Sequence, residues 1–119
     1  MKKHTYITIF LFVPNILMAG EWFALNNTEI INQENIVENK LWEYLNNTSQ
    51  VKFRAREKYK YQYTKEGEKI YINAFCDSWE KRNLNNELVI VKDGGSCYFR
   101  INYNLKTEKF SKLYVNGEV

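Results

Sequence analysis

Two cysteines and two aspartates are the residues of this chain with the clearest capacity for chemistry. Cys76 closes the segment I-N-A-F-C and Cys97 follows the turn D-G-G-S, with Asp77 and Asp93 beside them. Two cysteines allow one intramolecular disulfide, and the alternative is a thiol nucleophile at Cys97 on an active-site turn. A nucleophilic thiol needs a base to form thiolate, and the only histidine is His4. We therefore expect a Cys76–Cys97 disulfide.

The first nineteen residues have the pattern of a secretory signal peptide. A basic start, Met1–His4, precedes an apolar run, Thr5–Ala19, that ends in small residues. This order of basic, apolar and small residues is typical of a cleavable leader, and the run is shorter than the about 20 residues that a spanning helix needs. We expect cleavage after Ala19, which leaves one domain, residues 20–119, in the periplasm or secreted and without stable membrane insertion.

Export removes several kinds of chemistry and favours the cross-link. Paired cysteines usually oxidise outside the cytosol, and a loop of about 20 residues gives a disulfide worth about 3 kcal/mol. His4 leaves with the leader, so a Ser–His–Asp site has no base. Two cysteines without histidine rarely complete a zinc site. We expect no metal and no cofactor.

The charge and the tyrosine-rich stretch argue against a nucleic-acid partner. Loss of Lys2 and Lys3 lowers Lys+Arg from 17 to 15 against 14 acidic residues, so the net charge falls from +3 to about +1. A strongly cationic binder needs more charge, and clustered. In Lys58–Tyr63 the tyrosines alternate with lysines, which predicts tyrosines packed on one face rather than a platform for bases.

The elements that must position these residues are one helix and a series of strands. Asn26–Leu45 is expected to be the helix, with Asn26 as its cap and Glu29 at capping-box spacing; its apolar stripe has helical spacing. Alternation of period two predicts the strands, over Val51–Tyr63, Ile70–Cys76, Leu88–Val91, Tyr98–Tyr103 and Phe110–Val115.

This order predicts an α+β fold in which the helix packs on one face of a four- to five-stranded antiparallel sheet. In element order it resembles cystatin-like folds. The disulfide adds a constraint, because its Cα atoms must lie within about 7 Å. Residues 77–86 should therefore run back along the sheet, so that Cys97–Tyr103 lies antiparallel to Ile70–Cys76 with the cysteines adjacent.

The C-terminal half also resembles a known group of sequences. Its motifs Y-I-N-A-F-C, D-G-G-S-C-Y-F and V-N-G-E, between Tyr71 and Glu118, are similar to the signature of small exported Gram-negative bacterial proteins of unknown function. The resemblance covers roughly residues 59–119. It implies export and paired cysteines, and it carries over no catalytic residue.

The sequence favours a binding or inhibitory module over an enzyme. The sheet face away from the helix is expected to present aromatic and basic side chains, which are enriched in interface hot spots. The candidates are Tyr71, Phe75, Tyr98 and Arg100, with Trp22 or Trp79 as a further anchor. The partner would be a protein or an envelope component. The alternative is a carboxylate-dependent hydrolase in which Asp77 and Asp93 act as a general acid–base pair.

Overall fold

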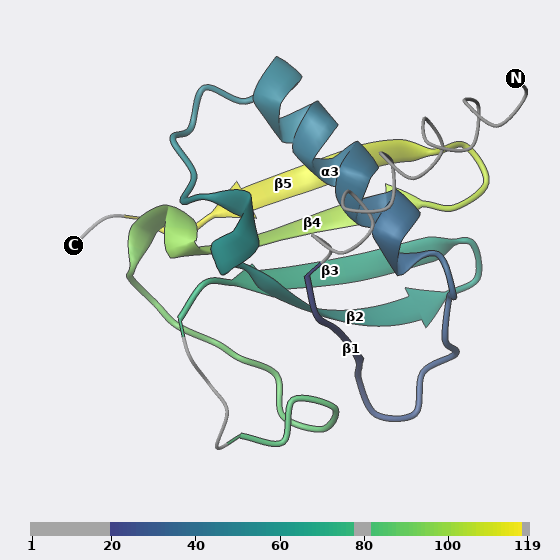
Figure 1. The fold of residues 1–119 in the computed structure, drawn as a ribbon. Helices are drawn as coiled ribbons and strands as arrows, with labels where there is room; N and C mark the ends of the chain where they lie inside the picture. The colour runs from purple at the N-terminus through teal and green to yellow at the C-terminus, as the bar shows by residue number, and fades with distance from the viewer. Residues whose placement is uncertain (1–19, 78–81, 118–119) are drawn as a thin grey trace, which may run out of the picture.

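The computed structural model describes residues 20–77 and 82–117, so the predicted leader and Trp79 lie outside the described residues. The described residues form one α-helix packed on a five-stranded sheet (Figure 1), which confirms the predicted α+β class. The elements are β1 (Trp22–Ala24), α3 (Glu34–Thr48), the 3-10 helix η1 (Arg56–Lys58), β2 (Lys60–Glu66), β3 (Lys69–Phe75), the 3-10 helix η2 (Gly95–Cys97), β4 (Tyr98–Asn104) and β5 (Lys109–Val115).

The strands lie side by side in chain order, from β1 to β5. The four long strands pair antiparallel, whereas the three-residue β1 adds parallel to β2, with Phe23 opposite Gln62. Strands β3 and β4 run antiparallel with Phe75 opposite Tyr98. The predicted placement of the two cysteine-bearing segments is therefore confirmed.

The helix begins at Glu34, so the prediction that it starts at Asn26 was wrong. Asn26, Asn27 and Asn32 have φ values of 50°, 61° and 56°. This left-handed conformation cannot continue a right-handed helix, and asparagine is one of the few residues that adopt it readily. The capping box expected at Asn26 is consequently absent, and the residues before the helix form β1 and a turn.

Two of the predicted strands also differ from the structure. The segment from Val51 to Tyr59 is irregular and contains η1, so the strand begins only at Lys60. Residues 88–91 form no strand and belong to a loop, residues 82–91, that lies across the sheet. Of the apolar residues in these segments, Phe53 and Val89 pack against a core cluster, whereas Val51 and Ile90 are exposed.

The main core lies between α3 and the sheet. Val37, Leu41 and Leu45 are almost completely buried along the helix, where their spacing places them on one face. They meet three tyrosines of the alternating stretch, each at most 1% exposed: Tyr59, Tyr61 and Tyr63. The prediction that these tyrosines pack inward is confirmed.

The hydroxyls of these three tyrosines each have a hydrogen-bond partner. Tyr61 accepts from Trp42 Nε1 at 2.8 Å, and Tyr63 accepts from the backbone N–H of Ile31 at 3.2 Å. Burial raises the pKa of both phenols, so they stay protonated at neutral pH. The tyrosines thus fill the core and also fix the helix and its preceding turn.

A second, smaller core lies on the other face of the sheet. Phe75, Tyr98 and Cys97 are buried there beneath Leu84 and Val89 of the 82–91 loop. Figure 1 shows this loop on the side of the sheet that α3 does not cover. One end of that face is therefore covered, and the other end is open.

Strand β5 contains an irregularity opposite β4. Arg100 pairs with Tyr114 and Asn102 with Ser111, so Lys112 and Leu113 together face Ile101. Lys112 has a φ of 57°. Two residues opposite one, with a residue in the left-handed region, make a β-bulge that turns the strand locally.

Candidate functional site

The open end of the sheet face away from α3 forms a groove of about 420 Å³, which we call the open-face groove. Its floor is made by side chains of β2, β3 and β4, and β5 and the 82–91 loop contribute its walls. The lining residues are Leu25, Gln62, Thr64, Tyr71, Ile72, Asn73, Leu88, Arg100, Asn102, Lys112 and Tyr114.

Only part of the predicted binding face belongs to this groove. Tyr71 and Arg100 line it, and Tyr71 is 38% exposed. Phe75 and Tyr98 point to the same side of the sheet but are 0% and 8% exposed, because the 82–91 loop covers them. These two residues therefore hold the loop and offer no exposed aromatic surface.

The walls of the groove combine aromatic rings with positive charge. The Arg100 guanidinium lies 4.7 Å from the centre of the Tyr114 ring, within the range of a cation–π contact. Lys112 is a second cation, and none of the described residues that line the groove has a carboxylate. Tyr114 is 53% and Leu88 44% exposed. The groove thus offers flat apolar surface beside two cations.

Tyr71 is oriented by a neighbour on the same sheet. Its hydroxyl donates to Glu66 Oε1 at 3.2 Å. Partial burial and the Glu66 carboxylate raise the pKa of the Tyr71 phenol, so it remains a hydrogen-bond donor. This hydrogen bond restrains the Tyr71 side chain, which lines the groove.

A buried amide makes several of the hydrogen bonds that hold the loop beside the groove. Gln62 is 0% exposed, and its Nε2 donates to the carbonyls of Leu84 at 2.9 Å and Glu87 at 2.6 Å. Its Oε1 accepts from the N–H of Val89 at 3.0 Å and from Asn73 Nδ2 at 3.1 Å. All four hydrogen-bonding positions of this amide are occupied.

Replacing Gln62 by leucine is expected to lower the free energy of unfolding by about 2 kcal/mol, because buried donors and acceptors of the loop lose their partner. Amide hydrogen exchange at Val89 should accelerate more than exchange in α3. The matched control is Gln33→Leu on the exposed residue before α3. Unchanged exchange at Val89 in the Gln62 variant would show that the amide does not hold the loop.

The disulfide is present between Cys76 and Cys97, with their Cα atoms 5.0 Å apart. Cys97 is 3% exposed, and the N–H of Cys76 donates to the Cys97 carbonyl at 3.0 Å. The bond therefore ties the end of β3 to the start of β4. It uses both thiols, so the Cys97 nucleophile that the sequence left open is not available.

Two glycines make the turn before Cys97 possible. Gly94 and Gly95 have φ values of 95° and 59°. A Cβ on Gly94 would lie 2.6 Å from Cε2 of the Tyr98 ring, so that ring packs against the bare backbone. The double glycine is explained by backbone conformation and close packing.

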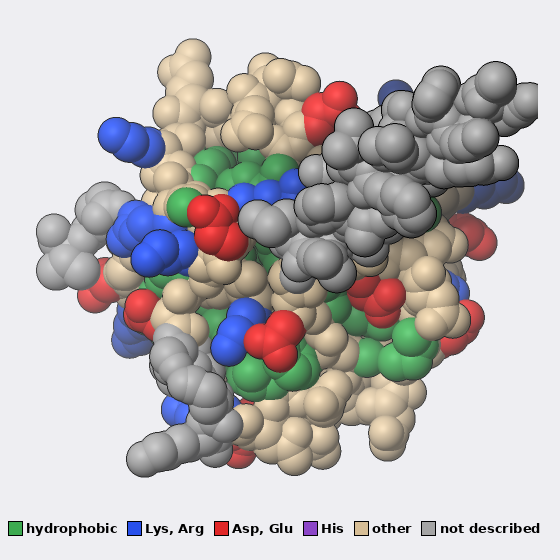
Figure 2. Space-filling view, in the orientation of Figure 1, with side chains coloured by type: hydrophobic (Ala, Val, Ile, Leu, Met, Phe, Trp, Pro, Cys, Tyr) green, Lys and Arg blue, Asp and Glu red, His purple; other side chains and the backbone are tan. Residues whose placement is uncertain are grey.

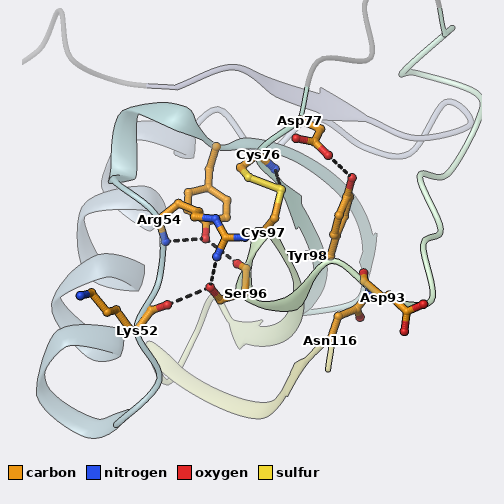
Figure 3. The surroundings of a disulfide bond; sticks show 10 residues. Lys52, Arg54, Cys76, Asp77, Asp93, Ser96, Cys97, Tyr98 and Asn116 are labelled. Atoms are coloured by element: carbon orange, nitrogen blue, oxygen red, sulfur yellow. Dashed lines mark hydrogen bonds between the residues drawn. A yellow bond between two sulfur atoms is a disulfide. The ribbon is translucent and has the colours of Figure 1, made fainter. Parts of the chain in front are cut away.

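Ser96 connects this turn to the segment after the helix (Figure 3). Its hydroxyl donates to the Lys52 carbonyl at 2.8 Å and accepts from Arg54 Nη1 at 2.9 Å. The Ser96 carbonyl accepts from the Tyr59 hydroxyl, and Tyr59 in turn accepts from the N–H of Arg54. The turn around the disulfide is thus an anchor for residues 52–59.

The two aspartates near the disulfide have different roles. Asp77 Oδ2 accepts from the Tyr98 hydroxyl at 2.6 Å. Asp93 contributes its carbonyl, which accepts from Asn116 Nδ2 at 3.0 Å. In Figure 3 the Tyr98 ring stands between the two residues, and the Asp93 carboxylate points away from Asp77.

A group of three metal-ligand types occurs at the same place. The ligand atoms of Cys76, Asp77 and Cys97 all lie within 4.8 Å of one another. Both sulfur atoms belong to the disulfide, whereas a metal binds thiolate. In the oxidised chain this group therefore leaves only the Asp77 carboxylate as a ligand.

Several groove residues were missed by the sequence analysis. Lys112 and Tyr114 were assigned to a strand, but the face of the sheet on which they lie was not predicted. Leu88 was assigned to a strand that does not form. Gln62 carried a usable signal, because it is the one uncharged polar residue between two core tyrosines on an otherwise basic face. A large amide in such a position indicates a backbone segment packed against the sheet.

The surface and the comparisons give no further assignment. Figure 2 shows basic and acidic side chains interspersed over the visible face. Within residues 20–77 and 82–117, no helix has the length and apolar character to cross a membrane. No known protein family, curated protein or solved structure matches this chain.

Proposed function

We propose that the protein is a non-enzymatic binding module of the periplasm or the extracellular space, and that it contacts its ligand through the open-face groove. The observation that supports this best is the groove itself, with two exposed tyrosines and two cations on a disulfide-linked sheet. Concave sites with apolar walls and a few placed polar groups are the usual form of ligand sites.

The lining favours one kind of ligand chemistry. Arg100 and Lys112 bring positive charge, and none of the described lining residues is acidic, although the Glu66 carboxylate accepts from the Tyr71 hydroxyl beside them. Tyr71 and Tyr114 offer flat rings beside these cations. The ligand we expect is a protein segment or envelope component that presents an apolar face together with a carboxylate or another anionic group.

The export on which this location depends is supported by the disulfide, because such bonds persist in oxidising compartments. The sequence pattern of residues 1–19 supports it independently. The resemblance to small exported bacterial proteins agrees with both, and it remains part of the proposal.

Substitution in the groove tests the binding function. We expect the oxidised mature protein to retain a component from the envelope fraction of the producing cell, and Tyr114→Ser to reduce its affinity at least tenfold, as at an interface hot spot. Affinity is measured by calorimetric titration of the retained component. The matched control is Ile36→Ser on the outer side of α3, since Ile36 is 54% exposed and Tyr114 53%.

Equal loss of affinity in the Tyr114 and Ile36 variants, or no loss in either, would contradict the groove as the contact. Arg100→Gln adds a charge test, because an anionic ligand should bind it more weakly and with reduced salt dependence. The alternative of a hydrolase that uses Asp77 and Asp93 remains a hypothesis. No contact between these two carboxylates supports it.

A further inference from the structure

We infer that Glu38 is the receiving site for the α-ammonium group that cleavage between Ala19 and Gly20 creates. The inference uses the predicted cleavage site and is independent of the open-face groove. Hydrolysis of that peptide bond consumes one water molecule, leaves a carboxylate on Ala19 and an amine on Gly20, and the amine takes up a proton. The peptidase is that of the exporting cell.

The first observation is an ionisable group in the core. Glu38 is 1% exposed, on the buried side of α3. A buried carboxylate is costly unless it is paired and hydrogen-bonded. Its Oε2 accepts from Arg56 Nε at 2.9 Å. One oxygen is thus paired with a cation.

The second observation is the position of the Gly20 nitrogen. It donates to the other oxygen, Glu38 Oε1, at 2.9 Å, and Trp22 Nε1 donates to the same atom at 3.0 Å. In the precursor both of these donors are neutral. Once the chain is cleaved between Ala19 and Gly20, the Gly20 nitrogen becomes an ammonium group at hydrogen-bond distance from a buried carboxylate. The hydrogen bond is charge-assisted in both forms, because the acceptor is a carboxylate. Cleavage adds the attraction between two opposite charges in a partly buried setting.

The third observation is that the receiving site fits glycine as the first residue. A Cβ on Gly20 would lie 3.1 Å from both the Tyr59 carbonyl oxygen and Cε2 of Tyr61, and 3.4 Å from Glu38 Oε1. The two shorter contacts are tighter than ordinary van der Waals distances. Gly20 therefore brings its nitrogen to Glu38 without displacing these neighbours.

The residues that follow hold the nitrogen in place. The N–H of Tyr61 donates to the Glu21 carbonyl at 3.0 Å, and the Trp22 ring stacks on Tyr61 with ring centres 4.4 Å apart. Residues 22–24 then pair with β2. With the backbone fixed from Glu21 onward, an ammonium at Gly20 stays beside the carboxylate.

The test compares two exported chains that differ only in where the new amine lies. One is the full 119-residue chain, and the other carries Gly-Ser inserted between Ala19 and Gly20. After export, intact mass should show that the first begins at Gly20 and the second two residues earlier. In the second chain the amine is displaced, while Gly20 keeps a neutral N–H for Glu38.

We expect the unfolding equilibrium constant of the inserted chain, measured in urea at pH 6.5 and low salt, to be about fivefold larger. In Glu38→Gln versions of both chains the ratio should fall below about twofold, because the carboxylate that distinguishes an ammonium from a neutral N–H is gone. Equal stability of the first pair, or an undiminished ratio in the Glu38→Gln pair, would overturn the inference. So would a natural product that does not begin at Gly20.

A second measurement applies if the Glu38→Gln chains do not fold. The rate at which an amine-reactive ester modifies the N-terminal amine is read by mass spectrometry of the N-terminal peptide. An ammonium held by Glu38 should react about fivefold more slowly than the displaced amine of the inserted chain, because a paired ammonium gives up its proton less readily. Equal rates would overturn the inference, whatever the outcome of the ligand-binding experiments.

Discussion

A chain in which Cys76 and Cys97 are both replaced by alanine is expected to lose about 3 kcal/mol of its free energy of unfolding. The disulfide joins residues 21 apart in sequence, and it restricts the unfolded chain more than the folded one. A domain of this size has a total stability of about 5–15 kcal/mol. The variant should therefore unfold at a clearly lower urea concentration.

Reduction of the unmodified chain gives the control. Its unfolding curve under a thiol reductant should approach that of the double variant, and the double variant itself should not respond to the reductant. Because Cys97 is 3% exposed, reduction is expected to be slow unless the protein is partly unfolded. A reduced wild-type chain as stable as the oxidised one would contradict a stabilising role for the bond.

Replacing Gly94 by alanine is expected to cost about 3 kcal/mol, for two reasons that add. Its φ of 95° is unfavourable for any residue with a Cβ, which costs about 1–2 kcal/mol. The added methyl group would also stand 2.6 Å from the Tyr98 ring, and such overpacking costs about 1–3 kcal/mol. Chemical unfolding of the oxidised protein measures the sum.

Gly67→Ala is the matched control, because it has a φ of 61° and nothing within 4 Å of an added Cβ. It should lose only about 1 kcal/mol, from conformation alone. The difference between the two variants then reports the contact with Tyr98. Equal losses in the two variants would show that the Tyr98 ring moves aside freely. Close packing against that ring would then not be a reason for glycine at position 94.

The sequence was sufficient to predict the pairing of β3 with β4, because a disulfide allows only a short separation between the Cα atoms of its two cysteines. A disulfide fixes two Cα atoms closely, and antiparallel strands then have only one neighbouring arrangement. The alternation of residue types also predicted that the tyrosines point inward, because successive side chains of a strand must point to opposite faces of the sheet.

The start of α3 could not be predicted in this way. Asn26 and Glu29 match a capping box, but the same asparagines also adopt left-handed conformations. What decided between the two was the packing of Trp22 on Tyr61 and the pairing of β1 with β2. Those contacts join segments far apart in the chain, so no local pattern contains them.

The candidate site was predicted only in part for a similar reason. Alternation assigned Tyr71, Phe75, Tyr98 and Arg100 correctly to one side of the sheet, but it could not show what covers that side. The 82–91 loop buries Phe75 and Tyr98 and leaves the other two exposed. Its placement depends on Gln62, whose four hydrogen bonds form only in the assembled fold.

The bulge in β5 has a consequence for how molecules of this protein meet one another. β5 is the outer strand on one side of the sheet, where unsatisfied backbone groups invite a strand from another molecule. At Lys112 the regular spacing of those groups is interrupted and a positive charge is present. A second copy therefore finds no continuous template for strand addition along β5.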